Sequence, residues 1–528
     1  MARKRIYLGG ELADYRQSIQ VLTDPSVSAH GLHFINASPT VEKNPLSGDP
    51  RVFCRKRPGV ISLYAETAFA RKFGKILFWV GLSDRYTGTN YWVYSTISGS
   101  NAIVKYSNSD GAPATMGSIA TSSINGSWFS MLSETDVSGT KTILAATANG
   151  GYAYYGENTP SSLTAISDAQ YPANDGQTTC GKFVPLDGYV FIMTQTGRVY
   201  NSDINSVTAW TSGNFITAGD YPDIGRGLAR YGTTIAAFGT KSIEFFRNSG
   251  NPTGSPLQRI QEYAVSGIGA IHAQSILQFD DNVYWLAEDS NLRISLYKFV
   301  NFKPVKLSTL PVERKFPSSS TGGWSVGIET TIFPMNVWGH KHICIPLDTT
   351  TTTPPFMMLM YNLELGIWWE WTTSTSSTAA IIDGSGGRFI TLKASDNTSG
   401  AISRLTDLAY LSSTEAQDDR GTQFTMRVVT SDHDFGNQKR KFLDRAFVVG
   451  DSALSSDATG DPSDPTITLR TNNDDYTTAS WSAARTMTLN QYLTRLGPFR
   501  RMAFDIENTD TNHVRLEWLE LEYREGTH

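Results

Sequence analysis

Residues 323–327 read Gly-Trp-Ser-Val-Gly and match the G-x-S-x-G pattern of a hydrolase nucleophile elbow. In such an elbow a strand precedes the serine and a helix follows it, which holds the hydroxyl exposed at a strained turn. Here a loop of Pro, Ser and Gly precedes Ser325, and the β-type sequence IETTIF follows it. These surroundings argue against a catalytic serine.

His340 and His342 are two residues apart, so on a strand they would lie on one face. A zinc site needs a third and a fourth ligand, and Cys344 is too common a neighbour to count as one. We therefore interpret the pair as strand histidines with local hydrogen bonds.

Four aspartates between positions 451 and 464 have the composition of a divalent-ion loop, but they lack the alternate spacing and closing glutamate of a calcium hand. A solvated loop is preferred over ion binding. The four residues are Asp451, Asp457, Asp461 and Asp464.

Two turns loosely resemble the S-x-D-x-G-x-x-W turns of sialidase-type propellers, in which the Asp caps a hairpin and the Trp packs between blades. A sialidase also needs three convergent arginines and a tyrosine nucleophile with an acidic partner, which nothing in this sequence marks. We therefore assign no catalytic, cofactor-binding or metal-ligating residue and expect no enzyme. A carbohydrate-active propeller, sialidase-like or lectin-like, is the alternative. The turn residues are Ser202, Asp203 and Trp210, and Asn473, Asp474 and Trp481.

The net charge of -5 gives the chain no general attraction to nucleic acid, and charged residues make up only 18% of it. Its short basic clusters are interpreted as solvated faces or as contacts for an acidic patch of a protein partner. These clusters are residues 3–5, 55–57, 439–441 and 500–501.

The cysteines Cys54, Cys180 and Cys344 are far apart and odd in number, which predicts buried reduced thiols rather than a disulfide framework. The basic N-terminus is not followed by the apolar core of a signal peptide, and no run of about 18 apolar residues predicts a membrane span. We expect a soluble protein made in a cytosol, with no cofactor.

Short apolar runs bounded by turn residues recur through the middle of the chain and predict antiparallel hairpins. Their spacing is close to the period of about 40 to 50 residues that is typical of a propeller blade. The sequence therefore predicts an all-β fold with a β-propeller of about six blades. The clearest paired runs are 142–146 with 152–155, 189–193 with 199–200, 234–238 with 243–246, 283–286 with 294–297, and 342–345 with 357–361.

Before the propeller, residues 1–60 are rich in turn formers and predict an extended N-terminal arm that becomes ordered on assembly. After residue 411, alternating runs without helical segments predict a C-terminal β-sandwich. The expected domains are 1-60, 61-410 and 411-528. Residues 317–323 and 349–355 are expected to form exposed loops, and 356–371 two core strands around a turn at 362–366.

Residues 200–308 resemble the tail-hub, or nozzle, proteins of short-tailed bacteriophages, also called packaged-DNA stabilisation proteins. Weaker marks lie at 57–59 and in the C-terminal part of the chain, whereas the tract 349–353 and the acidic loop near Asp457 fit no family pattern. The main marks are Ser202-Asp203 with Trp210, Asp223-Ile224, Phe238-Gly239, 242–246 with Asn248, 267–270 and 281–286. The C-terminal marks are Trp481, Arg495, Gly497, Arg500-Arg501 and Phe504.

The resemblance implies a structural virion protein, made in the host cytoplasm, that forms a hexameric ring in the phage tail. Such a ring sits below the portal and adaptor rings, continues the DNA channel, retains the packaged genome until ejection, and lets tail fibres, spikes or a needle dock. Double-stranded DNA would pass through without sequence-specific binding. No membrane insertion is implied.

Overall fold

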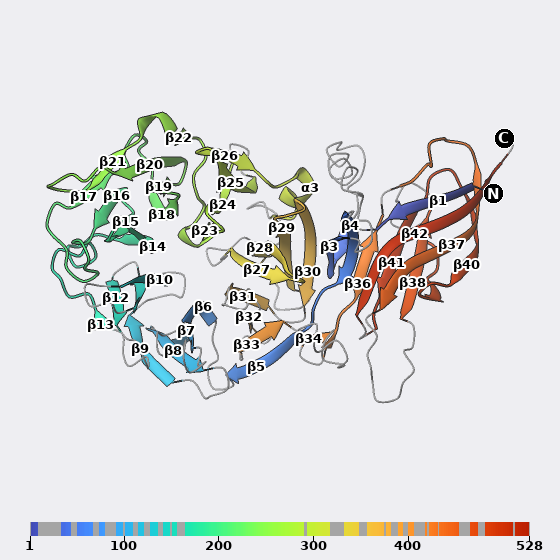
Figure 1. Cartoon of the computed structure of the whole chain (residues 1–528), viewed down its shortest axis with the longest axis horizontal. Coiled ribbons are helices and arrows are strands. Elements are labelled where there is room, and N and C mark those ends of the chain that lie inside the picture. Colours follow the sequence, from blue (N-terminus) through green and yellow to red (C-terminus); the bar gives the residue numbers. More distant parts are fainter. Residues whose placement is uncertain are drawn as a thin grey trace.

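Short strands make up nearly all of the secondary structure in the computed structural model, and they form eight sheets among the described residues (Figure 1). The helical elements among the described residues are single turns, namely η3 (Gln261–Tyr263), η4 (Ala273–Ser275) and α3 (Leu310–Glu313). Among the residues that the structure describes, no helix has the length and hydropathy to cross a membrane. The described residues are 2–8, 33–43, 50–66, 73–79, 91–98, 101–108, 114–120, 127–135, 141–147, 150–155, 164–289, 293–316, 332–347, 356–373, 376–381, 389–393, 400–405, 418–419, 422–430, 432–452, 465–473, 481–510 and 513–526.

Five sheets are each built from strands that follow one another in the sequence and pair antiparallel in that order. The first two are β6 (Phe73–Trp79), β7 (Tyr91–Ser98), β8 (Asn101–Asn108) and β9 (Ala114–Ala120), then β10 (Ser127–Thr135), β11 (Lys141–Thr147), β12 (Gly150–Tyr155) and β13 (Thr164–Ala165). The next two are β14 (Thr179–Leu186), β15 (Tyr189–Thr194), β16 (Arg198–Asn201) and β17 (Phe215–Thr217), then β18 (Gly225–Tyr231), β19 (Thr234–Gly239), β20 (Ser242–Asn248) and β21 (Leu257–Arg259), with β22 (Val265–Ser266) on β20. The fifth is β23 (Ile276–Phe279), β24 (Asn282–Glu288), β25 (Ile294–Val300) and β26 (Lys303–Lys306).

Two further groups of four strands complete the propeller. One is the run β27 to β30, and in the other β5 pairs antiparallel with β33, so a strand from before the propeller completes its last sheet. The first group is β27 (Phe333–Val337), β28 (His340–Leu347), β29 (Phe356–Asn362) and β30 (Ile367–Thr373). The second is β31 (Ser376–Ile381), β32 (Phe389–Lys393), β33 (Gly400–Leu405) and β5 (Val60–Glu66), extended by β34 (Asp418–Asp419) and β35 (Thr422–Gln423).

The seven groups follow one another around a ring (Figure 1). Contacts join the first strands of successive groups, β6 with β10, β10 with β14, β14 with β18 and β18 with β23, and they also join β27 with β31 and β31 with β6. Between the fifth and sixth groups, Leu286 and Ile343 share one core cluster. The first strands therefore lie on the inside of the ring. The described strands form seven blades, where the sequence predicts about six.

The hairpins that the apolar runs predict are confirmed. Residues 234–238 and 243–246 form β19 and β20, and the segment 356–371 forms β29 and β30 around a turn at Gly366. Every residue of β19 is buried, because a blade packs between two neighbours and both of its faces are covered. The loops 317–323 and 349–355 lie outside the described residues.

The second part of the molecule is a β-sandwich whose two sheets combine strands from both ends of the chain. One sheet has the order β3-β4-β42-β37-β40 with β1 on β42, and its strands are β1 (Ala2–Tyr7), β3 (Ala37–Lys43), β4 (Pro50–Lys56), β37 (Lys441–Ser452), β40 (Tyr492–Phe499) and β42 (Val514–Glu525). The other has the order β2-β36-β41-β38-β39, and its strands are β2 (His33–Ile35), β36 (Met426–Val429), β38 (Thr466–Asn472), β39 (Arg485–Thr488) and β41 (Ala503–Asn508).

Propeller and sandwich share a sheet and a core. Strand β2 pairs with β30 in parallel and with β36 antiparallel, so the sixth blade continues edge to edge into the sandwich. Phe34, Trp371 and Val428 belong to one cluster of buried side chains. The segment 1–60, expected as an arm that becomes ordered on assembly, supplies β1 to β4 to this sandwich, and these strands are already paired within the chain. The domain boundaries stay predictions.

Candidate functional site: buried polar centres of the propeller and its junction

Of the positions that could carry chemistry, residues 323–327 and the aspartates 457, 461 and 464 lie outside the described residues. His340 Nδ1 lies 2.6 Å from Glu364 Oε2, and His342 Nδ1 lies 2.9 Å from the His340 carbonyl oxygen, as expected for strand histidines with local hydrogen bonds. Burial lowers the pKa of His342 to about 3, so this ring is neutral. The described residues contain no group of His, Cys, Asp and Glu arranged to hold a metal ion.

Asp451 and the three cysteines lie in environments that stabilise the fold. Asp451 Oδ1 accepts a hydrogen bond from Arg515 Nε at 2.8 Å, which ties β37 to β42. Cys54, Cys180 and Cys344 are free and buried, and burial raises the pKa of each thiol. The expected buried reduced thiols are therefore present, and none of the three is activated as a nucleophile.

One turn in the fourth blade brings several marks of the family resemblance together. The carboxylate of Asp223 accepts hydrogen bonds from Lys241 N at 2.7 Å and from Ser242 Oγ at 3.0 Å. A Cβ on Gly239 would lie 2.3 Å from Asp223 Oδ1, so only glycine fits at this position. The Ala270 amide donates to Gly239 O at 2.9 Å. These residues hold the β19–β20 hairpin.

Ser202, Asp203 and Trp210 form a similar support in the third blade. Ser202 Oγ accepts a hydrogen bond from Val190 N at 3.0 Å, and Thr211 Oγ1 donates to Asp203 Oδ1 at 2.7 Å. Trp210 is buried edge-on against Tyr171, which lies in the connection from the preceding blade. The motif is therefore structural, as the sequence indicates.

A buried ion pair in the fourth blade was not apparent from the sequence. Glu244 is 1% exposed, and its Oε2 lies 2.8 Å from Arg259 Nε. Burial is the main cause that raises the pKa of Glu244, while the Asp220 amide and Arg259 act against it. The ion pair joins the neighbouring strands β20 and β21, and the hydrogen bond from the Asp220 amide to Glu244 fixes them to the loop before β18.

The junction between propeller and sandwich is built around Arg57, which is 0% exposed. Its Nε donates to Asn36 Oδ1 at 2.8 Å, and its Nη2 donates to Thr372 O at 2.9 Å. The guanidinium carbon lies 4.2 Å from the ring centroid of Trp371 and 3.5 Å from that of Phe424. Arg57 thus joins the outer strand of the sixth blade to the sandwich.

Lys56 extends this junction on the sandwich side and is also 0% exposed. Its ammonium donates to Asn508 Oδ1 at 3.2 Å and to Asp510 O, and its carbonyl accepts from Trp338 Nε1 at 3.0 Å. The interpretation of residues 55–57 as a solvated face or partner contact is therefore wrong. Apolar and carbonyl groups from distant strands enclose both cations.

A second polar centre lies where β2 meets β30. Glu370 is 5% exposed, and its Oε1 lies 2.5 Å from His33 Nε2 and 2.6 Å from Lys315 Nζ. Burial acts to raise the pKa of Glu370, but His33 and Lys315 outweigh it, so this pKa lies below its ordinary value. The carboxylate thus stays charged at the edge where the two parts join.

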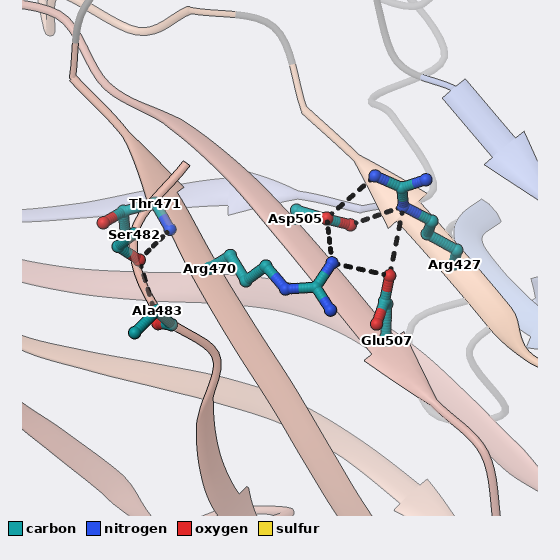
Figure 2. A network of polar contacts seen from close by, with 7 residues as sticks. All are labelled: Arg427, Arg470, Thr471, Ser482, Ala483, Asp505 and Glu507. Carbon is teal, nitrogen blue, oxygen red and sulfur yellow. Dashed lines mark hydrogen bonds and ion pairs between the residues drawn. The ribbon is translucent and has the colours of Figure 1, made fainter. Parts of the chain in front are cut away.

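The outer face of the sandwich carries a ladder of ion pairs (Figure 2). Asp505 is 1% exposed and accepts two hydrogen bonds from Arg427, each at 2.9 Å. Arg470 reaches Asp505 at 3.3 Å and Glu507 at 3.1 Å. The hydrogen bond to Asp505 raises the pKa of Arg427. Strands β36, β41 and β38 are therefore locked side by side.

Comparison with known proteins gives these centres a context. Residues 96–351 match a family model described as "Bacteriophage P22 Gp10, beta-propeller". The chain belongs to the phage tail-hub family. The marks between 202 and 286 lie inside the matched region, so the turn-holding residues of this tail-hub chain are part of its family propeller. It is a bacteriophage tail protein and a component of the virion.

No curated protein matches the tail-hub chain. Among solved structures, it is similar to the AfRom2 CNH domain with 12% identity and a TM-score of 0.29, over 49% of this chain and 70% of that one. It is also similar to a chain from the crystal structure of the mitotic checkpoint complex, with 11% identity and a TM-score of 0.34, over 60% of this chain and 88% of that one.

Proposed function

We propose that copies of this chain form a closed, hexameric ring, the tail hub or nozzle, in the tail of a short-tailed phage. The ring continues the channel of the portal and adaptor rings and retains the packaged DNA until ejection. It also gives tail fibres, spikes or a needle a place to dock. The match of residues 96–351 to the phage propeller family is the observation that carries this proposal.

The physical properties of the chain suit a mechanical part. A net charge of -5 limits the counterion release that would hold DNA tightly in a channel it must leave quickly. The sheet shared by β30, β2 and β36 joins propeller and sandwich firmly, so force on one part is transmitted to the other. In this role the protein needs no catalytic group, inserts into no membrane, and is made in the host cytoplasm.

Mass photometry of the purified chain, mixed with the adaptor ring of the same phage, tests the proposal. We expect a discrete species with the mass of the adaptor ring plus six copies, and electron microscopy should show them as one ring. The adaptor has to be present, because a hub protein can stay monomeric alone. A chain that stays monomeric beside an intact adaptor ring would contradict the proposal.

Virions assembled without the chain give a second test, of DNA retention. We expect the packaged genome to leak, so that DNA in purified particles becomes accessible to nuclease. Full particles with protected DNA would contradict the retention role. Turnover of a fluorogenic sialoside or related glycoside would instead support a carbohydrate-active propeller.

A further inference from the structure

A buried lysine and a buried asparagine meet between the two sheets of the sandwich. Lys56 is the last residue of β4 in one sheet, and Asn508 is the last residue of β41 in the other. Lys56 Nζ lies 3.2 Å from Asn508 Oδ1, and the two residues are 0% and 2% exposed. They are 452 positions apart in the chain, so the contact forms only when both ends of the chain have folded together.

The side-chain amide of Asn508 is held in one orientation. Its Nδ2 donates to Thr466 O at 3.0 Å and lies 3.4 Å from Asp510 Oδ2, while its Oδ1 faces Lys56. Lys56 Nζ also donates to the Asp510 carbonyl oxygen and lies 5.1 Å from the centroid of the Phe424 ring. An amine, an amide carbonyl group and a carboxylate therefore meet at one point.

These three groups are the ones that formation of an amide bond between two side chains requires. An uncharged amine attacks a carbonyl carbon, and a carboxylate carries the proton. Lys56 Nζ lies no more than about 4.5 Å from Asn508 Cγ, because a C=O bond adds only about 1.2 Å to the distance to Oδ1. Removal from water favours the uncharged form of an amine. Well-oriented groups within one molecule react as if at effective concentrations of about 10⁵ to 10⁸ M, which makes attack on a stable amide feasible.

We propose that Lys56 and Asn508 join in a spontaneous isopeptide bond, with Asp510 as the catalytic residue that carries the proton. The uncharged Nζ forms a bond to Cγ, the Cγ–Nδ2 bond breaks with its electron pair on nitrogen, and Nδ2 leaves as ammonia. The Asp510 carboxylate takes one proton from Nζ and gives it to the Nδ2 that it already contacts, so no other reactant is consumed. The bond ties β4 covalently to β41. It is independent of the proposed role in the phage tail.

Mass spectrometry of the intact, purified chain tests for the bond. We expect a mass below that of the unmodified sequence by one ammonia molecule, about 17 Da. Trypsin does not cleave after an acylated lysine or between arginine and proline. The bond should therefore yield one branched peptide, in which residues 56–71 are joined to residues 502–515.

Substitutions assign the loss of mass to these residues. Lys56→Arg removes the nucleophile and Asn508→Ala removes the carbonyl group, and each should abolish the loss. Asp510→Asn keeps both reacting groups but not the proton carrier, and it should leave most chains without the bond. Lys441→Arg is the matched control. Lys441 is also 0% exposed, but its Nζ donates to main-chain carbonyl groups, so the loss of mass should persist in this variant.

Two results would overturn the proposal. One is a folded wild-type chain of unreduced mass that yields separate tryptic peptides 57–71 and 502–515. The other is a loss of ammonia that persists in Lys56→Arg or Asn508→Ala, since the ammonia would then come from another residue. An unchanged yield of the bond in Asp510→Asn would contradict the role of Asp510. If a variant fails to fold, the mass and the peptide map of the wild-type chain decide the question.

Discussion

In the propeller, the strands that pair are neighbours in the sequence, whereas in the sandwich they come from opposite ends of the chain. The blade β23 to β26 lies within residues 276–306, while β1 pairs with β42 from Ala2↔Tyr523 onward. Buried aromatic side chains are concentrated in the fourth and fifth blades, whereas one sheet of the sandwich adds a ladder of ion pairs to its apolar core. The two parts should therefore respond differently to loss of apolar contact and to loss of charge.

The largest expected effect is in the propeller, from Trp285→Ala. Trp285 is fully buried, with ring centroids 4.3 Å from Phe299 and 5.4 Å from Phe238. Truncation of such a side chain leaves a cavity, and we expect a loss of about 3 to 5 kcal/mol in the free energy of unfolding. Chemical denaturation measures it. Tyr221→Ala, at a 40% exposed aromatic, is the control, and an equal loss in both variants would contradict the aromatic core.

The second largest effect is expected at the junction between propeller and sandwich, from Arg57→Ala. The change removes hydrogen bonds to Asn36 and Thr372 and leaves the acceptors buried, so we expect a loss of about 3 kcal/mol. We also expect a single calorimetric transition to separate into two, one for the propeller and one for the sandwich. Arg500→Ala, at an exposed arginine, is the control. A single unshifted transition in Arg57→Ala would show that Arg57 does not couple the two parts.

The ion-pair ladder of the sandwich is expected to contribute less, because its arginines are about one-third exposed. Asp505→Asn leaves Arg427 and Arg470 without their shared carboxylate, and we expect a loss of about 2 kcal/mol after discounting for solvent. Asp444→Asn removes an exposed pair with Arg524 and should change nothing measurable. An unchanged free energy of unfolding in Asp505→Asn, or an equal loss in Asp444→Asn, would contradict the assignment.

The smallest expected effect is on the pH dependence of stability, and it comes from His513 at the junction. Burial, together with Arg55, Arg515 and Lys56, lowers the pKa of His513 to about 3. Because the folded pKa lies below the unfolded value of about 6.5, the stability from this histidine is present at pH 7 and is lost as the pH falls.

Between pH 7 and 5.5 this loss amounts to about 1 kcal/mol for one histidine. His513→Phe keeps the edge-on contact with Trp338 and removes the titrating group, so its stability should fall less over this interval. The slope of unfolding free energy against pH, measured for both proteins, is the test. Identical slopes would show that His513 protonates freely in the folded chain.

The same comparison explains what the sequence could predict. The hairpins β19–β20, β24–β25 and β29–β30 could be predicted, because each is a pair of apolar runs around one turn. Three other features could not be predicted, because no local pattern indicates a partner hundreds of residues away. They are the closure of the last blade by β5, the parallel pairing of β2 with β30, and the position of β1 beside β42.

The role of Arg57 was hidden for a related reason. A basic run such as 55–57 is normally a surface feature, because burial of a charge is costly unless partners are present. Those partners, Asn36, Thr372 and Phe424, come from three separate segments that only the fold brings together. The β-bulges between Cys180 and Val184 in β14 and between Gly225 and Gly227 in β18 could not be predicted either, since they depend on the register between strands.

Electron cryomicroscopy of the phage tail, at a resolution that separates strands, tests the central claim most directly. The account predicts copies of a seven-bladed propeller joined to a two-sheet sandwich, arranged as a ring around the axis of the channel below the adaptor. A tail whose ring is built from another chain, with no propeller density around the channel, would contradict it.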